Sequence, residues 1–182
     1  MRKQQREAIL ALLEETYMGT ETALNYSTPF ELLVAVIMSA QCTDERVNKI
    51  TARIFPKYNT PEKMGALSQE QLEEEIRDCG LFRSKAKNLL ATCKMLTEEY
   101  NSVIPDTVEE LMKLPGVGKK TANVVASIVY KVPAIAVDTH VFRVSHRLGL
   151  AKGDDPLAVE KELQKAIPKN KWSDAHHWLI WH

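Results

Sequence analysis

The sequence lacks any hydrophobic run long enough to cross a membrane, and Glu14 and Glu15 interrupt its apolar N-terminal stretch. Neither a membrane protein nor a secretory signal peptide is therefore expected. Cysteine is scarce as well, because Cys42, Cys79 and Cys93 are odd in number and show no close metal-ligand spacing. With neither a disulfide framework nor a cysteine-based metal motif, the thiols are expected to stay reduced, which predicts a cytoplasmic protein.

The chain also lacks a net charge, since its 24 basic residues balance its 24 acidic residues. Composition alone therefore does not indicate a nucleic-acid partner, and DNA binding would have to rest on local clusters. Two basic clusters occur, and a solvent-exposed helix face is the simpler explanation of each. They comprise Lys113, Lys119 and Lys120, and Arg83, Lys85, Lys87 and Lys94.

Glycine is infrequent, at 7 of 182 residues, whereas apolar residues make up 45% of the chain. The apolar residues recur with helical period and no alternating strand pattern competes with them, so the sequence predicts an all-α protein. Helix starts are expected at Thr28-Pro29 and at Asp155-Pro156, because a polar cap followed by proline is a start signal. One helix is expected to stop at Gly80 and to leave Leu81 and Phe82 in a loop.

The most informative stretch joins two expected helices through a short glycine turn. Gly116 and Gly118 permit backbone angles closed to other residues, and their missing side chains let another surface approach the peptide groups. The helix that begins at about Lys119 directs its unpaired N–H groups and the positive end of its dipole toward this turn. An anion such as a phosphate is therefore the expected ligand.

The residues around the glycines favour DNA binding over a simple chain reversal. Apolar Leu114 and Val117 are placed to anchor the turn inward, while Lys119, Lys120 and Thr121 supply an outward, polar side. An ordinary helix-turn-helix corner would be the better interpretation of two glycines alone. The longer pattern instead predicts a grip on the nucleic-acid backbone.

The glycine turn and the segment Val137-Asp138-Thr139-His140 together resemble the helix-hairpin-helix DNA glycosylases, and within them the endonuclease III branch. The resemblance continues through Ser39-Ala40-Gln41, Gly80-Leu81 and the segment 176–180, and so covers nearly the whole chain. It implies two helical lobes that flank a DNA-binding cleft. The expected lobes are residues 22–132, with the helix-hairpin-helix at about 107–130, and residues 1–21 plus 133–182.

The candidate catalytic residues are Lys120 and Asp138. In the first turn of a helix, beside Lys119, positive neighbours favour the neutral, nucleophilic form of an amine. The resemblance implies that Lys120 attacks C1′ of a damaged nucleoside and forms a Schiff base, and that Asp138 assists proton transfer and balances the developing charge. The simpler alternatives are a solvated lysine and an aspartate that only caps the following helix.

The resemblance also implies residues that hold DNA and fill the space of an extruded nucleotide. Gln41 would bond the orphaned base and Leu81 would replace the lost stacking, although a helix-terminal polar residue and a buried loop leucine are the simpler explanations. Asp44 is expected near the lesion cleft, or else as an ordinary first-turn acid. The expected DNA-binding residues are Gln41, Leu81, Leu114, Gly116, Val117, Gly118, Lys119, Thr121, His140 and Arg143.

No cofactor is expected on residues of this chain. The resemblance implies a [4Fe–4S] cluster held by four cysteines after the position of His182 in a longer relative, and Cys42, Cys79 and Cys93 cannot replace them at their spacing. The last expected helix has no cap before His182, which favours a chain that continues. The three histidines near the end, His176, His177 and His182, are expected to pack rather than to bind metal.

The sequence thus predicts a bifunctional DNA N-glycosylase and apurinic/apyrimidinic (AP) lyase that removes oxidised pyrimidines and cuts 3′ to the site by β-elimination. Its expected partner is double-stranded DNA with a damaged pyrimidine or an abasic site, bound by a cytoplasmic, nucleoid-associated monomer. Two alternatives stay open. One is a monofunctional adenine glycosylase of the same superfamily, and the other is a non-catalytic helix-hairpin-helix module.

Overall fold

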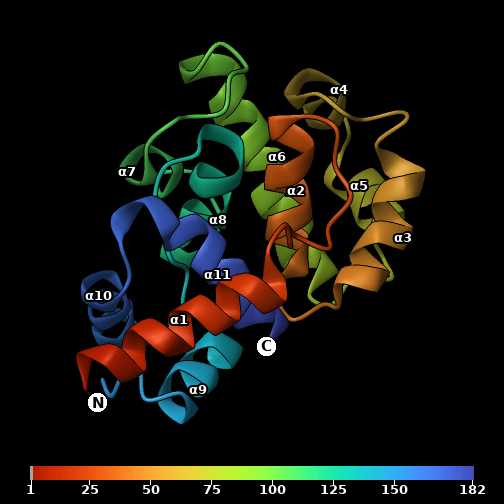
Figure 1. Cartoon of the computed structure of the whole chain (residues 1–182). Coiled ribbons are helices and arrows are strands. Elements are labelled where there is room, and N and C mark those ends of the chain that lie inside the picture. Colours follow the sequence, from red (N-terminus) through yellow and green to blue (C-terminus); the bar gives the residue numbers. More distant parts are fainter. Residues whose placement is uncertain (1) are drawn as a thin grey trace. The chain divides into compact units, whose positions relative to one another are not determined.

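The structure, a computed structural model, describes residues 2–182, and all of its regular elements are helices (Figure 1). The all-α prediction is therefore confirmed for these residues. No helix among them is both long and apolar enough to span a membrane. The elements are α1 Lys3–Tyr17, α2 Pro29–Ser39, α3 Asp44–Ile54, α4 Pro61–Gly65, α5 Gln69–Glu75, α6 Phe82–Glu99, α7 Val108–Leu111, α8 Lys119–Tyr130, α9 Thr139–Arg147, α10 Pro156–Ala166, the 3₁₀ helix η1 Lys169–Lys171 and α11 Trp172–Trp181.

The chain forms two compact units. One is Ala23–Val125, and the other joins Met1–Thr22 to Ala126–His182, so the boundary between them falls inside α8. We call them the central unit and the terminal unit. The lobe boundaries expected from the sequence, at residues 22 and 133, stay a prediction.

The central unit is built on α2, which contacts α3 and α6 (Figure 1). Thr28 caps its N-terminus by accepting a hydrogen bond from the Glu31 N–H at 3.1 Å, and Pro29 occupies the first helical position, as the sequence predicts. Leu32 and Leu33 are fully buried. Every residue from Phe30 to Met38 is buried, and burial of one leucine side chain contributes about 2 kcal/mol, so this helix stabilises the core of the unit.

The terminal unit packs α1 and α9 against α11, and α10 against α9. Leu13, Val141 and Trp178 belong to its buried core. The Lys171 ammonium bonds the Glu14 carboxylate at 2.6 Å, and the Trp181 indole N–H donates to the Glu21 carbonyl at 3.1 Å. Residues from opposite ends of the chain therefore stabilise one unit.

Two expected boundaries near Gly80 are wrong. Helix α5 ends at Glu75 rather than continuing to Gly80, and Phe82 is the first residue of α6 rather than part of a loop. Leu81 is the N-cap of α6 and has a left-handed backbone with φ of 60°. A Cβ on Gly80 would lie 2.8 Å from the Gln41 carbonyl oxygen, so this glycine permits a close backbone approach and does not end a helix.

Candidate functional site

The glycine turn is supported from inside the central unit. Leu114 and Val117 are buried at 2% and 6% exposure, which confirms that they anchor the turn inward. The Thr92 hydroxyl of α6 donates to the Pro115 carbonyl at 2.9 Å. The Leu114 N–H donates to the Leu111 carbonyl and the Val117 N–H donates to the Leu114 carbonyl, both at 3.1 Å, so these backbone groups also serve the turn. The DNA contacts expected of the two residues stay a prediction.

The two glycines of this turn differ in their roles. Gly116 has φ of +77°, and a Cβ there would come within 2.9 to 3.1 Å of the Asn88 side chain. Gly118 has no left-handed φ, and a Cβ there would meet nothing within 4 Å. Gly118 thus does not use the left-handed angles that glycine permits, and it instead leaves its peptide open to an approaching group.

Lys119 and Lys120 lie exposed in the first turn of α8, and Thr121 follows half-buried. Lys120 interacts electrostatically with Asp44, the first residue of α3. Partial burial raises the pKa of the Asp44 carboxyl, and the attraction to Lys120 opposes that rise. The first turns of α3 and α8 therefore bring a carboxylate and an amine together within the central unit.

Asp138 is the N-cap of α9 in the terminal unit. It is half-buried, and its Oδ1 accepts a hydrogen bond from the Val141 N–H at 2.7 Å. The capping role expected from the sequence is confirmed, and it fixes the direction of the carboxylate. Lys120 belongs to the other unit, so the arrangement in which the two residues face each other stays a prediction.

His140 and Arg143 form a pair on α9, with the His140 Nδ1 and the Arg143 Nη2 3.1 Å apart. The Arg143 side chain is exposed, whereas the Nε2 of His140 is buried and has no hydrogen-bond partner within residues 2–182. A phosphate contact from this pair stays a prediction.

Gln41 and Leu81 are both exposed, and both have left-handed backbones, with φ of 53° and 60°. Leu81 is 57% exposed, which contradicts the simpler explanation of a buried loop leucine. A left-handed backbone costs a residue other than glycine about 1–2 kcal/mol, so the surrounding structure must impose it. Such strained and exposed residues on neighbouring segments are typical of a functional site.

The sequence places Lys85 in a solvent-exposed basic cluster, and this placement is wrong. Its side chain is only 5% exposed, and the ammonium donates to the carbonyls of Met38 at 2.8 Å and Ala40 at 2.6 Å. A further hydrogen bond of 3.3 Å reaches the Cys79 sulfur. Lys85 therefore holds the end of α2, just before Gln41, against the segment that leads to Leu81.

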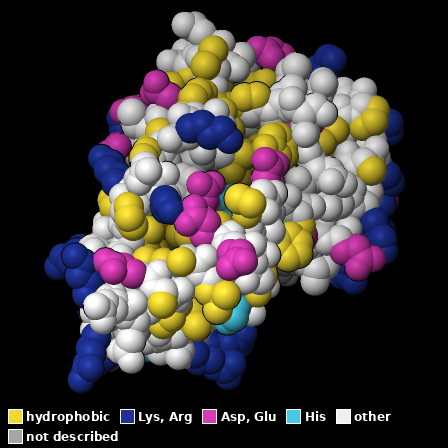
Figure 2. All heavy atoms as spheres, in the orientation of Figure 1, with side chains coloured by type: hydrophobic (Ala, Val, Ile, Leu, Met, Phe, Trp, Pro, Cys, Tyr) yellow, Lys and Arg dark blue, Asp and Glu magenta, His cyan; other side chains and the backbone are white. Residues whose placement is uncertain are grey.

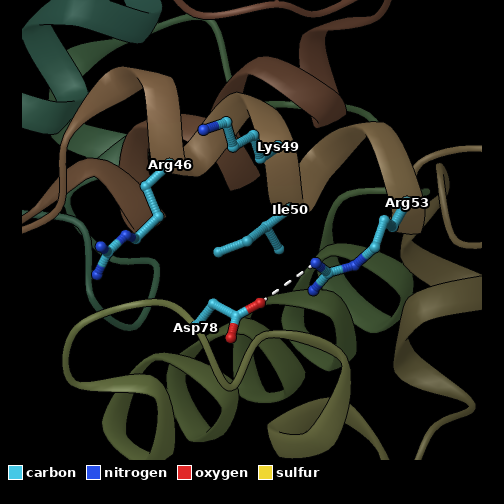
Figure 3. Close-up of a pocket in the computed structure, with 5 residues that line it drawn as sticks. All are labelled: Arg46, Lys49, Ile50, Arg53 and Asp78. Atoms are coloured by element: carbon cyan, nitrogen blue, oxygen red, sulfur yellow. Dashed lines mark hydrogen bonds and ion pairs between the residues drawn. The ribbon is translucent and has the colours of Figure 1, made fainter.

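The charged surface includes a basic hollow that the sequence did not reveal. Figure 2 shows basic and acidic side chains interspersed over the face in view, as the balanced composition predicts. In the central unit, however, α3 contributes several cations to a shallow pocket of about 380 Å³ (Figure 3). Among the lining residues, the Asp78 carboxylate bonds Arg53 at 3.2 Å, and Lys49 is paired with the Glu45 carboxylate at 2.8 Å. The lining residues are Arg46, Lys49, Ile50, Arg53 and Asp78.

The described residues do not fit an iron–sulfur cluster. Within residues 2–182, no three or more His, Cys, Asp or Glu side chains are grouped to hold a metal ion, and the three cysteines are free thiols. His176 is buried, and its Nδ1 lies 3.0 Å from the Ala136 carbonyl, so packing explains it. The His182 Nδ1 lies 3.1 Å from the Tyr17 hydroxyl. A cluster beyond His182 in a longer relative stays a prediction.

Comparison with known proteins places the chain in a family. Residues 34–169 match the family model described as HhH-GPD superfamily base excision DNA repair protein. A thermostable thymine-DNA glycosylase shares the fold with a TM-score of 0.83, although only 20% of the sequence is identical. The chain therefore belongs to the HhH-GPD superfamily of base excision DNA repair proteins.

Relatives with higher sequence identity show which branch of the superfamily the chain belongs to. The chain is 50% identical over 177 residues to Endonuclease III of Bacillus subtilis, covering 97% of this chain and 81% of that protein, and 47% identical over 182 residues to Endonuclease III of Escherichia coli K12. A solved structure of a trapped endonuclease III–DNA covalent intermediate has a TM-score of 0.95 and 52% identity, covering 100% of this chain and 85% of that one. Within the superfamily the chain is a member of the endonuclease III family, as the sequence resemblance predicted.

Proposed function

We propose that this chain is a bifunctional DNA N-glycosylase and AP lyase of base excision repair, acting on oxidised pyrimidines. The observation that carries the proposal is Lys120, an exposed amine in the first turn behind a glycine hairpin. It lies in a chain that matches, over its whole length, an endonuclease III trapped in a covalent intermediate with DNA. An amine at a phosphate-binding helix terminus is suited to attack a sugar carbon next to the bound backbone.

The reaction follows from imine chemistry. The Lys120 nitrogen attacks C1′, the bond from C1′ to the base breaks, and the base leaves with the bonding electrons. The sugar ring opens to an imine, a proton leaves C2′, and the C3′–O bond breaks, so the strand is cut 3′ to the site. Hydrolysis of the imine regenerates the amine.

Asp138 is proposed to take the proton from the attacking amine and to balance the positive charge that develops on the sugar. Its support is the hydrogen bond from the Val141 N–H, because a carboxylate fixed in direction needs no reorganisation when charge develops. Asp44, which interacts with Lys120, supplies a second carboxylate near the amine.

The proposed DNA contacts divide between the two units. In the central unit, the open peptide at Gly118 and the N-terminus of α8 would hold a phosphate, with Lys119 and Thr121 beside it. Exposed Leu81 would fill the space of the extruded nucleotide, while Gln41 would bond the base left without a partner. In the terminal unit, His140 and Arg143 would contact the backbone.

The proposed partner is double-stranded DNA that contains a damaged pyrimidine or an abasic site, bound by one copy of the chain. Support for DNA comes from a non-covalent endonuclease III–DNA complex, which has 52% identity and a TM-score of 0.95. We place the activity on cytoplasmic, nucleoid DNA, in keeping with the free thiols of the three cysteines.

Cleavage of defined duplexes tests the proposal. One duplex carries thymine glycol and another an abasic site, and both are incubated with the chain in the presence of EDTA. Base release together with a cut 3′ to the site is expected, because imine chemistry needs no divalent metal. Base release without a cut would instead indicate a monofunctional glycosylase, and binding without either reaction would indicate a DNA-binding module.

A further inference from the structure

Two thiols and an ammonium meet where the segments bearing Gln41 and Leu81 touch. The Cys79 side chain is 2% exposed, and its thiol donates to the Met38 carbonyl at 3.4 Å. The Lys85 ammonium donates to the Cys79 sulfur at 3.3 Å. Cys42, which directly follows Gln41, is half-buried, and its side chain interacts with the Cys79 thiol. No step of the proposed reaction uses these two thiols.

The backbone already holds the two segments in contact. The Lys85 ammonium bonds both the Met38 and the Ala40 carbonyls. A Cβ on Gly80 would lie 2.8 Å from the Gln41 carbonyl oxygen, so the peptide next to Cys79 lies against the peptide next to Cys42. A disulfide requires closely spaced Cβ atoms, about 3.8 Å apart, and fixed segments in contact favour that geometry.

We propose that Cys42 and Cys79 form a dithiol site that a hydroperoxide converts into a reversible disulfide. Cys42 is the less buried of the two residues, and so it reacts first. Its thiolate attacks the peroxide oxygen, the O–O bond breaks, and a sulfenic acid forms while hydroxide or alkoxide leaves. The Cys79 sulfur then attacks the Cys42 sulfur and expels hydroxide. Two thiols lose two electrons in total, and hydrogen peroxide is reduced to two molecules of water.

Lys85 supports the second step. Burial raises the pKa of the Cys79 thiol, and the neighbouring ammonium opposes that rise by favouring the thiolate. The third cysteine offers a matched comparison within the same unit. Cys93 is 1% exposed, and burial raises its pKa to about 12, so it is expected to stay reduced.

The disulfide would act on the segments that carry Gln41 and Leu81. It would join the residue after Gln41 to the residue two positions before Leu81, and so would limit how far these side chains can move apart. This consequence rests on the proposed function, in which both side chains enter DNA. Oxidation is therefore expected to lower strand cleavage reversibly, whereas formation of the disulfide itself needs no DNA.

Peptide mapping tests the dithiol site directly. The chain is treated with hydrogen peroxide, alkylated with N-ethylmaleimide under denaturing conditions and digested. The expected product is one linked pair of peptides containing Cys42 and Cys79, lighter by two hydrogens and separated by dithiothreitol, with Cys93 alkylated. Unlinked and fully alkylated Cys42 and Cys79, or a link to Cys93 or to a second chain, would overturn the proposal.

Variants separate the chemical steps. Cys42→Ser, at a half-buried position, should abolish the linked pair, whereas Cys93→Ser should retain it. Cys79→Ser should leave Cys42 as a sulfenic acid that dimedone labels, and circular dichroism confirms that this variant is folded. If the linked pair forms but cleavage of abasic DNA is unchanged, the proposed effect on the Gln41 and Leu81 segments is overturned. Peptide mapping shows whether the disulfide forms even if the chain cuts no DNA.

Discussion

The Asp44 carboxylate lies close enough to the Lys120 amine for the two charges to attract each other. Each residue belongs to the first turn of its helix, α3 and α8, within one compact unit. The proposed nucleophile thus has a carboxylate neighbour in its own unit, in addition to the role proposed for Asp138. Asp44 also lies three positions after Gln41. The same short segment therefore contacts the Lys120 amine electrostatically and carries a residue proposed to enter the DNA.

Asp44 should leave a signature in the pH dependence of stability. Burial raises the pKa of its carboxyl above the ordinary value of 3.8, so the folded chain binds this proton more tightly than the unfolded chain does. The stability that Asp44 contributes therefore falls as the pH rises through the pKa of its carboxyl. Relative to Asp44→Asn, the wild-type Tm is expected to improve as the pH is lowered from 7 toward 4. A difference in Tm that moves the opposite way would contradict this assignment.

Asp138 combines a capping role with a proposed catalytic one, and Asp138→Asn separates them. Asparagine caps helices about as well as aspartate, so the hydrogen bond with the Val141 N–H should survive and Tm should change little. The charge is lost, and cleavage of abasic DNA is expected to fall about 10²-fold or more, as for loss of a general base.

The control for this variant is Asp155→Asn. Asp155 caps α10 by accepting from the Ala158 N–H at 2.8 Å and has no role in the proposed reaction. Cleavage should be unchanged in this variant. Equal activity in the two asparagine variants would show that Asp138 only caps its helix.

The two glycines of the hairpin should respond differently to alanine. At Gly116 the left-handed backbone and the nearby Asn88 side chain oppose a Cβ, so Gly116→Ala is expected to lower the free energy of unfolding by about 1–2 kcal/mol in a urea titration.

Gly118→Ala should leave stability nearly unchanged, because a Cβ there meets nothing within 4 Å. It should nevertheless weaken binding to a fluorescent oligonucleotide with an abasic-site analogue, since the methyl group would occupy the space into which a phosphate must come. Full binding by Gly118→Ala would mean that this peptide does not approach DNA.

Lys85 is buried and hydrogen-bonded, although its charge suggested that it would lie on the surface. Lys85→Met would leave the Ala40 carbonyl without its ammonium donor and the Met38 carbonyl with only the Cys79 thiol, and a buried group left unsatisfied costs about 1–3 kcal/mol. The free energy of unfolding, measured in urea, should fall by a similar amount. Lys87→Met, at an exposed position on the same helix, is the control and should be close to neutral. Equal stability of the two variants would show that the buried hydrogen bonds contribute nothing net.

The sequence predicted features that depend on residues close together in the chain. The caps at Thr28, Asp138 and Asp155 and the inward anchors Leu114 and Val117 are all confirmed, because a cap or a turn is decided within a few residues. The helical class followed in the same way from apolar spacing.

Features that depend on contacts between distant segments escaped prediction. Lys85 resembled an exposed lysine because its carbonyl partner on Met38 is 47 positions away. Gly80 matched the sequence pattern of a helix end, but its position needs glycine because a Cβ there would collide with the carbonyl oxygen of Gln41. The interaction of Asp44 with Lys120, and the approach of Asp78 to the cations of α3, likewise arise only when the chain has folded.

Reduction of the covalent intermediate tests the central claim most directly. The chain is incubated with an oligonucleotide that contains an abasic site in the presence of sodium borohydride, and the cross-linked peptide is mapped by mass spectrometry. We expect a stable adduct on the Lys120 nitrogen that disappears in Lys120→Ala and persists in Lys119→Ala. An adduct that Lys120→Ala retains, or a chain that binds this DNA and forms none, would contradict the assignment of Lys120 as the nucleophile.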